Sequence, residues 1–263
     1  MTTPYARSVG DEVEQPLSGG NTHACVVRAG DTVRRPTGPW TPAVHEVLAR
    51  LAERGIPAPR ALGIDERGRD ILSFIPGDVI WPGHVDLLGD EDALESLGRS
   101  IRDVHDALVG YDPPAAVWST RAADPSGSRE LLCHNDLGLW NLVRSGDDWV
   151  CIDWDLAAPG RRSWDVSLAL LSSVSLMPDS SIDEARTLGR IRAFVHGYGT
   201  DPFPPDTLRV AVERCGIEAR MIEAEAARGD EVARRLLAEG HADIWRAAEQ
   251  HISRNRMRWQ SAI

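Results

Sequence analysis

The first part of the chain alternates short apolar runs with turn residues, a pattern that predicts antiparallel strands. Residues 24–28 and 32–36 are expected to form one hairpin around an Ala-Gly-Asp turn, and residues 61–77 a second hairpin. Between them, residues 42–55 place apolar side chains at helical spacing, with a proline near the start and a glycine at the end. The pattern therefore predicts a small sheet accompanied by one helix.

Longer segments with a helical period follow this sheet. Residues 91–111 repeat apolar side chains every three or four positions, and beyond residue 162 almost the whole chain shows the same period. The expected C-terminal helices lie within residues 163–176, 182–198, 204–229 and 231–259. Short strands are expected ahead of these helices, around residues 130–133, 142–144 and 149–152.

This order of elements predicts an α+β fold with two lobes. A small N-terminal lobe contains the antiparallel sheet and one helix, and a larger C-terminal lobe is mainly α-helical. We place the lobes at residues 1–76 and 77–263, joined near Phe74 to Gly77. A joint between two lobes creates a cleft, and clefts of this kind are favoured ligand sites.

Composition narrows the classes of function. The formal net charge is −11 over 263 residues, whereas a nucleic-acid-binding protein usually has the opposite sign. No apolar run is long enough to cross a bilayer, and the first residues contain no apolar signal core. The four cysteines stand far apart, which argues against a disulfide framework or a structural zinc site. We therefore expect a cytoplasmic protein that binds neither nucleic acid nor a membrane.

The sequence contains no lysine, and all 29 basic residues are arginine. A Walker A phosphate loop requires lysine, so that class of nucleotide-binding enzyme is excluded. Any cation that binds a phosphate in this chain must be an arginine.

The segment from 133 to 157 places three carboxylates, Asp136, Asp153 and Asp155, beside two short apolar strands that also carry His134 and Asn141. Buried charge is costly without a partner. A metal ion with a nucleotide is one partner that would complete such acids, and an ordinary hairpin with exposed acids is the structural alternative.

Two sequence motifs decide between these alternatives. "HNDLGLWN" matches an H-[GN]-D-x-x-x-x-N loop, and "VCIDWDLAAPGRRSWDVSLAL" matches an I-D-[WF]-[DE] strand followed by a helix with W-D-[VL]. Together with the order of the two lobes, they resemble the aminoglycoside phosphotransferase / choline kinase-like family of protein-kinase-like small-molecule kinases. The resemblance runs from about Leu17 to the helices after Asp165 and is weakest in the C-terminal helices.

The resemblance implies roles for the polar residues of the segment. Asp136 would orient the acceptor hydroxyl and accept its proton, and His134 would hold the catalytic loop by hydrogen bonds. Asn141 and Asp153 would bind Mg²⁺, which prefers oxygen ligands and few protein groups. Asp155 would bind a second metal, face the acceptor or bond local backbone amides, and the sequence leaves these three alternatives open.

The resemblance also implies a nucleotide site in the first lobe. Arg34 matches the basic position of the third strand, with Arg35 as the alternative, and only one of them can face the cleft because neighbouring strand residues point to opposite sides. Glu46 on the helix is the candidate partner of that arginine, and a solvated acid on the helix surface is the alternative for this residue. The expected phosphate-binding turn consists of Ser18, Gly19, Gly20 and Asn21. The hinge residues expected to bond the adenine are Ser73, Phe74 and Ile75.

The function implied is Mg²⁺-dependent transfer of the γ-phosphate of ATP, or of GTP, to a hydroxyl of a small acceptor. The acidic chain and the family favour a cationic acceptor such as an aminoglycoside or another amino alcohol. Antibiotic resistance, metabolism and biosynthesis stay open as roles. The alternative is a non-catalytic nucleotide- or ligand-binding protein on the same fold. The expected partner is the small molecule alone, and the chain is expected to be a monomer or a homodimer.

Overall fold

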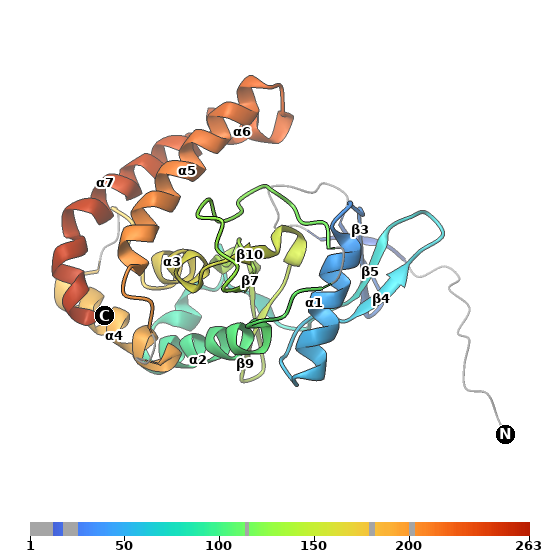
Figure 1. Cartoon of the computed structure of the whole chain (residues 1–263), viewed down its shortest axis with the longest axis horizontal. Helices are drawn as coiled ribbons and strands as arrows, with labels where there is room; N and C mark the ends of the chain where they lie inside the picture. Colours follow the sequence, from blue (N-terminus) through green and yellow to red (C-terminus); the bar gives the residue numbers. More distant parts are fainter. Residues whose placement is uncertain (1–12, 18–25, 114–115, 179–181, 200–202) are drawn as a thin grey trace.

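The structure, a computed structural model, describes residues 13–17, 26–113, 116–178, 182–199 and 203–263. A sheet with one helix forms one end of the molecule, and helices form most of the rest (Figure 1). The prediction of a protein-kinase-like α+β fold is confirmed. None of the helices in the described part of the chain combines the length and apolar character needed to span a bilayer.

The N-terminal sheet has five strands in the order β1-β2-β3-β5-β4, and every neighbouring pair is antiparallel. The strands are β1 (Gln15–Pro16), β2 (Val27–Ala29), β3 (Thr32–Arg35), β4 (Ala61–Ile64) and β5 (Asp70–Ser73). Both predicted hairpins are present.

Helix α1 (Thr41–Glu53) packs its apolar stripe into the core. The four residues that the helical period predicted to face inward are fully buried: Val44, Val47, Leu48 and Leu51. Removal of such side chains from water is the main favourable term that fixes a helix of this length.

The chain changes sheet directly after β5. Strand β6 (Asp78–Val79) pairs with β8 in a second, three-stranded sheet, β6-β8-β9, which lies with the helices. The remaining strands and short helices are η1 (Val85–Leu88), β7 (Leu131–Cys133), η2 (Leu139–Asn141), β8 (Leu142–Ser145), β9 (Asp148–Cys151), η3 (Trp154–Leu156), β10 (Ala158–Gly160) and η4 (Gln260–Ala262). The lobe boundary at residue 76 stays a prediction, and the change of sheet between Ser73 and Asp78 supports it.

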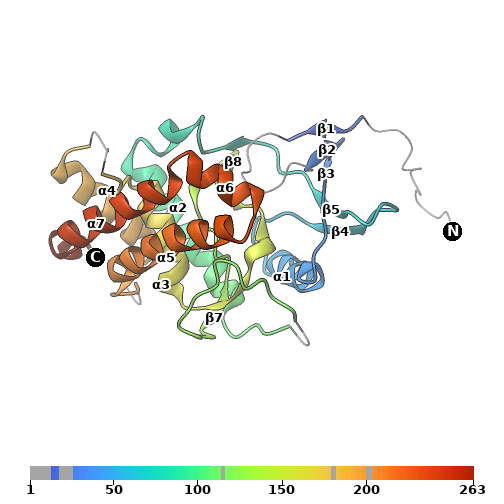
Figure 2. The same cartoon turned by 90° about the horizontal axis from the view of Figure 1, so that it is seen from above.

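The larger helices form two long pairs, α2 with α4 and α5 with α7, and both views show α5 and α7 side by side with α6 at their tip (Figures 1 and 2). The helices are α2 (Glu91–Leu108), α3 (Arg162–Ser173), α4 (Glu184–Tyr198), α5 (Thr207–Ala227), α6 (Glu231–Ala238) and α7 (His241–Trp259). Residues 231–259 were expected to be one helical segment. They form two helices because Gly240, with φ of 81°, takes a left-handed conformation and reverses the chain.

Two glycines allow α2 and α4 to approach closely. A Cβ added to Gly98 would overlap the backbone oxygen of Phe194, and a Cβ added to Gly197 would overlap the backbone oxygen of Glu95. These atoms belong to helix backbones and cannot move aside as a flexible side chain can. The α2–α4 contact therefore depends on the absence of side chains at both positions.

We expect Gly197→Ala to lower the free energy of unfolding by about 1–3 kcal/mol, because the added Cβ overlaps the backbone of α2. Helix propensity alone predicts the opposite, since alanine is a better helix former than glycine. Chemical denaturation measures this change. Gly83→Ala is the control, because a Cβ at this exposed residue meets nothing within 4 Å. Equal stability of the two variants would show that the helices can separate without cost.

Candidate active site

The β8–β9 hairpin brings the two predicted metal ligands to one end of its sheet. Leu142 pairs with Cys151 at the end of the ladder, and the amide of Ile152 donates to the carbonyl of Asn141 (3.0 Å). Asp153 follows with a left-handed backbone (φ 61°), which turns its side chain away from the strand, and this side chain is 39% exposed. Asn141 and Asp153 therefore stand together where the hairpin opens.

The loop between β7 and β8 contains another left-handed residue. Asn135 has φ of 66°, a conformation that glycine and asparagine adopt with the least strain. Its side-chain amide donates to the carbonyl of Leu156 (2.8 Å), and its own carbonyl accepts a hydrogen bond from Arg214. The family that the motif resembles often has glycine at the position after the histidine. Asparagine can replace glycine here because it tolerates the left-handed conformation that this position requires.

A buried carboxylate holds the start of this loop. Asp165, in the first turn of α3, accepts hydrogen bonds from the backbone amides of His134 (2.6 Å) and Asn135 (2.8 Å). It also lies 3.3 Å from Nε2 of the buried His105. Burial raises the pKa of Asp165, but the hydrogen bond and charge of His105 and the contacts of His134 outweigh it and hold the pKa below its ordinary value. Asp165 therefore acts as an anion that fixes the backbone.

His134 points into the protein and not into the cleft. Its Nε2 lies 2.8 Å from the carbonyl of Ile152, and its ring packs against Trp154 with 4.6 Å between ring centroids. Burial lowers the pKa of His134, so the neutral ring can donate through Nε2. This geometry fits the predicted role of holding the loop to the end of β9.

Asp136 is the residue of the loop best placed to accept a proton. Its Oδ2 accepts hydrogen bonds from Trp140 Nε1 (3.1 Å) and Asn141 Nδ2 (2.9 Å). Burial raises the pKa of Asp136 to about 7, while the Trp140 hydrogen bond and the charge of Arg214 act in the opposite direction. A base works best when its pKa lies near the working pH, so this value suits proton transfer at neutral pH.

The donor set at the hairpin fits a magnesium ion. Asn141 Nδ2 donates to both the backbone oxygen and Oδ2 of Asp136 (2.9 Å each), so the amide oxygen is the atom that can bind a cation. Asp153 supplies a carboxylate beside it. Mg²⁺ prefers oxygen ligands and keeps several from water and substrate, so a site that offers one amide oxygen and one carboxylate fits it.

The structure corrects the register of the basic residue on β3. Arg34 lies 3.9 Å from Asp65 and faces away from the hairpin. Arg35, the alternative, donates to Asp153 (3.1 Å) and lies 2.7 Å from Asp155. The expected phosphate contact therefore moves from Arg34 to Arg35, and Asp155 pairs with this arginine.

Two other predictions for the first lobe have different outcomes. Glu46 was the candidate partner of the arginine, but its carboxylate accepts a hydrogen bond from Tyr111 Oη (3.4 Å) instead. The carboxylate that pairs with Arg35 from the first lobe comes from a different element, β5. The predicted phosphate turn, residues 18–21, lies outside the described residues, and its role stays a prediction.

The predicted hinge can present fewer amides than expected. The amides of Ser73 and Phe74 already donate to the carbonyls of Arg60 and Asp31 (2.9 Å each). Among the three predicted hinge residues, this leaves the amide of Ile75 as the candidate donor to an adenine.

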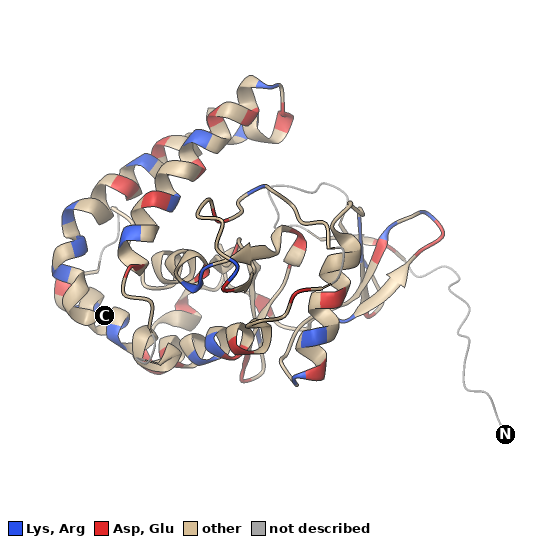
Figure 3. Ribbon diagram, in the orientation of Figure 1, with Lys and Arg blue, Asp and Glu red and all other residues tan. Residues whose placement is uncertain are grey.

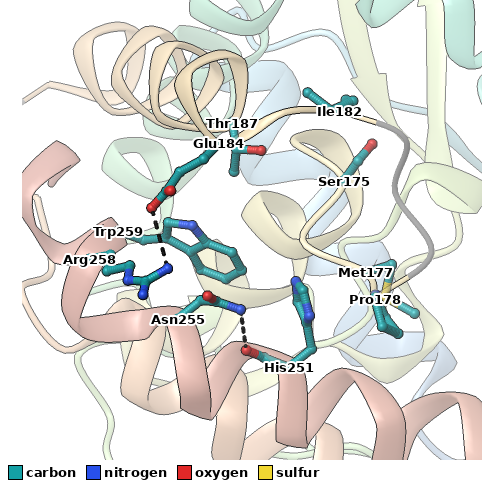
Figure 4. Close-up of a pocket in the computed structure, with 10 residues that line it drawn as sticks. All are labelled: Ser175, Met177, Pro178, Ile182, Glu184, Thr187, His251, Asn255, Arg258 and Trp259. Carbon is teal, nitrogen blue, oxygen red and sulfur yellow. Dashed lines mark hydrogen bonds and ion pairs between the residues drawn. The ribbon is translucent and has the colours of Figure 1, made fainter.

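A cavity of about 160 Å³ lies away from these residues, between α7 and the segment that leads into α4 (Figure 4). Its lining consists of Ser175, Met177, Pro178, Ile182, Glu184, Thr187, His251, Asn255, Arg258 and Trp259. None of these belongs to the catalytic loop, the hairpin or β3, so the cavity is separate from the candidate active site.

Two buried charges of the site escaped the sequence analysis. Asp70 opens β5 beneath Arg35, and Arg214 reaches from α5 to the carbonyls of Asn135 and Trp164. Neither lies in a recognisable motif. Each also follows another charged residue, Arg69 or Glu213, so no local signal in the sequence marked it as buried.

Comparisons with known proteins identify the family of the chain. The profile of the "Phosphotransferase enzyme family" matches residues 114–211. The trifolitoxin immunity protein of Rhizobium leguminosarum bv. trifolii is 34% identical over 196 residues, which cover 70% of this chain and 73% of that protein.

Solved structures share the fold at low sequence identity. An amicoumacin kinase in complex with AMP-PNP and Ca²⁺ has a TM-score of 0.63 at 13% identity, with 92% of this chain and 88% of that chain covered. The GDP complex of aminoglycoside 2'-phosphotransferase-IIIa has a TM-score of 0.61 at 14% identity, with 94% and 95% covered. A choline/ethanolamine kinase family protein from Mesorhizobium loti has a TM-score of 0.58 at 18% identity, with 93% and 92% covered.

A sheet lobe, a helical lobe and an H-x-D loop facing an acidic hairpin define the class of protein-kinase-like phosphotransferases. The chain belongs to the phosphotransferase enzyme family, and it is a small-molecule kinase.

We expect Asp136→Asn to be more stable than the wild type at pH 8. The folded chain has a higher pKa at this carboxyl than the unfolded chain, so its stabilising contribution is complete below about pH 4 and is lost as pH rises to about 7. Asparagine cannot ionise and can still accept the bonds from Trp140 and Asn141. The difference in melting temperature should therefore shrink as pH falls from 8 to 4.

Thermal unfolding across this pH range measures the effect. Asp103→Asn, on the exposed face of α2, is the control and should follow the wild type. A constant difference between Asp136→Asn and the wild type at every pH would contradict the elevated pKa.

Proposed function

We propose that the chain transfers the γ-phosphate of ATP, with Mg²⁺, to a hydroxyl group of a small molecule. The observation that carries this proposal is the convergence of Asp136, Asn141 and Asp153 at one opening, with hydrogen bonds linking the first two. The chain thus supplies a base and two oxygen ligands, the minimum set for phosphoryl transfer in a protein-kinase-like site.

Asp136 acts as the base. Its Oδ2 is held by Trp140 and Asn141, so Oδ1 is the oxygen that can accept a hydrogen bond from an acceptor hydroxyl. The carboxylate orients the attacking oxygen and takes its proton as the new bond to the γ-phosphorus forms and the bond from that phosphorus to the bridging oxygen breaks, which releases ADP. Catalysis of this kind depends mainly on positioning, because the transferred phosphoryl group requires little covalent help from the protein.

The second set of residues binds the nucleotide. Asn141 and Asp153 would hold Mg²⁺, which neutralises charge on the phosphates. Arg35 lies next to Asp153 and is the cation of β3 that can bind a phosphate oxygen. An arginine suits this task because its planar fork matches phosphate oxygens and stays charged at every relevant pH.

The acceptor that we propose is a small cationic compound such as an aminoglycoside or another amino alcohol. The net charge of −11 attracts cations. Figure 3 shows acidic residues interspersed with basic ones along α5 to α7. One of these acids, Glu218, lies close enough to Asp136 to raise its pKa, so a negative charge stands near the proposed base. The name of the relative, an immunity protein, supports a role in protection from an antimicrobial compound by its phosphorylation.

We expect Asp136→Ala to reduce kcat by roughly 10²–10⁴-fold or more while ATP affinity is retained, because the base contacts the acceptor and not the nucleotide. Turnover with a panel of aminoglycosides and amino alcohols, and calorimetry with ATP and Mg²⁺, measure the two quantities. Asp103→Asn is again the control. Turnover of Asp136→Ala near that of the wild type would remove Asp136 from the mechanism.

We expect ATP and Mg²⁺ together to raise the melting temperature, and Asp153→Ala to lose that shift. A ligand at a hundred times its Kd adds about 2.7 kcal/mol to stability, which corresponds to a few degrees or more in a chain of this size. Differential scanning fluorimetry with Mg²⁺, with ATP and with both measures it. A shift that persists in Asp153→Ala would contradict the metal assignment, and no shift in the wild type would favour a non-catalytic binding protein.

A further inference from the structure

Asp70 is a buried carboxylate with two partners and no part in the chemistry described so far. Its side chain is 0% exposed at the start of β5. Oδ2 accepts a hydrogen bond from Arg35 Nε (3.0 Å), and Oδ1 lies 2.7 Å from His45 Nε2. A buried anion is tolerated only when its charge and its hydrogen bonds are satisfied, and here one partner comes from β3 and the other from α1.

The sheet register fixes the contact between Asp70 and Arg35. The two residues are directly opposite each other on the antiparallel strands β3 and β5, so their side chains lie on the same face. Arg34 is opposite Ile71 and lies on the other face. The same register that brings Arg35 to the cleft therefore also gives it a carboxylate partner within its own sheet.

The contact uses one edge of the guanidinium and leaves the other directed at the second lobe. Arg35 donates through Nε to Asp70, while Nη1 lies 3.1 Å from Asp153 and Nη2 lies 2.7 Å from Asp155. The donors of a lysine all lie on one nitrogen, so a lysine lacks the rigid fork that holds Nε at Asp70 while Nη1 and Nη2 reach other carboxylates. Asp70 thus restrains Arg35 at Nε, and this directs Nη1 and Nη2 towards the end of the β8–β9 hairpin.

Helix α1 joins this arrangement through His45 and not through Glu46. His45 bonds to Asp70, whereas the neighbouring Glu46 faces Tyr111. Burial raises the pKa of Asp70, but the hydrogen bond of His45 and the charge of Arg35 outweigh it and hold the pKa below its ordinary value. The carboxylate therefore stays ionised as the counter-charge of Arg35.

We propose that Asp70 is the positioning residue that aims Arg35 at the phosphates of the nucleotide, and that His45 connects α1 to it in place of the Glu46–arginine pair. The inference rests on the proposed function, since Arg35 needs a nucleotide to bind. Asp70 touches neither substrate in this arrangement and acts only through Arg35.

We expect Asp70→Asn to weaken ATP binding roughly 10- to 100-fold, the usual effect of losing one hydrogen bond between charged groups. In kinetics the change should raise the KM for ATP, with kcat and the KM for the acceptor changed much less. Calorimetry with ATP and Mg²⁺, in the absence of an acceptor, provides a readout independent of turnover. Glu53→Gln, on the exposed face of α1, is the control and should bind ATP as the wild type does.

A double-mutant cycle separates positioning from general support of the fold. If Asp70 acts through Arg35, then Asp70→Asn should weaken ATP binding no further once Arg35→Met is present. The double variant also removes both buried charges, so it should fold even where the single variant leaves an unpaired arginine. Additive losses in the cycle would overturn the proposal.

The competing assignment makes the opposite prediction for two variants. If Glu46 positions the arginine, Glu46→Gln raises the KM for ATP and Asp70→Asn does not, and this result would overturn the proposal while the proposed function stands. A wild-type chain that binds no ATP would overturn both. Weak ATP binding by Asp70→Asn, restored towards the wild-type value in Asp70→Glu, would support the proposal.

Discussion

The geometry of the site depends on one carboxylate, that of Asp165. This carboxylate accepts hydrogen bonds from the backbone amides of His134 and Asn135 at the start of the catalytic loop. These bonds fix the left-handed turn at Asn135, which directly precedes Asp136. A non-glycine residue in this conformation is under strain, and it persists only when the surrounding structure over-determines it. Asp165, Leu156 and Arg214 do so here from three different elements. The turn is therefore held by hydrogen bonds from within the chain itself.

The parts of the fold that could be predicted from the sequence are those with a local signal. The apolar stripes of α1 and α2, the two N-terminal hairpins and the β8–β9 hairpin follow from period and turn residues alone. The break at Gly240 was missed because the helical period continues on both sides of it. Strand β6 has only two residues, and its pairing with β8 is a non-local contact that no local pattern specifies.

Much of the candidate site could also be predicted, because its central residues lie in two short motifs. The first lobe was harder. The difference between Arg34 and Arg35 is a difference of register, and register is set by which residues of β3 and β5 stand opposite each other. Glu46 was the candidate partner because an acid is the expected partner of an arginine, and His45 was not considered for that role. The structure places the acid on the strand and the histidine on the helix, an exchange that requires knowledge of distant contacts.

The short link between the two sheets limits how the lobes can move. β5 ends at Ser73, the amide of Phe74 is bonded to Asp31, and β6 begins at Asp78, so only three consecutive residues remain outside these bonds. A link of three residues permits one lobe to rotate relative to the other, but it is too short to let one lobe slide far along the other. Arg35 forms a second connection between the two parts of the chain, because its guanidinium contacts Asp153 and Asp155. Any separation of the two sheets at this point must therefore pull one guanidinium away from two carboxylates at once.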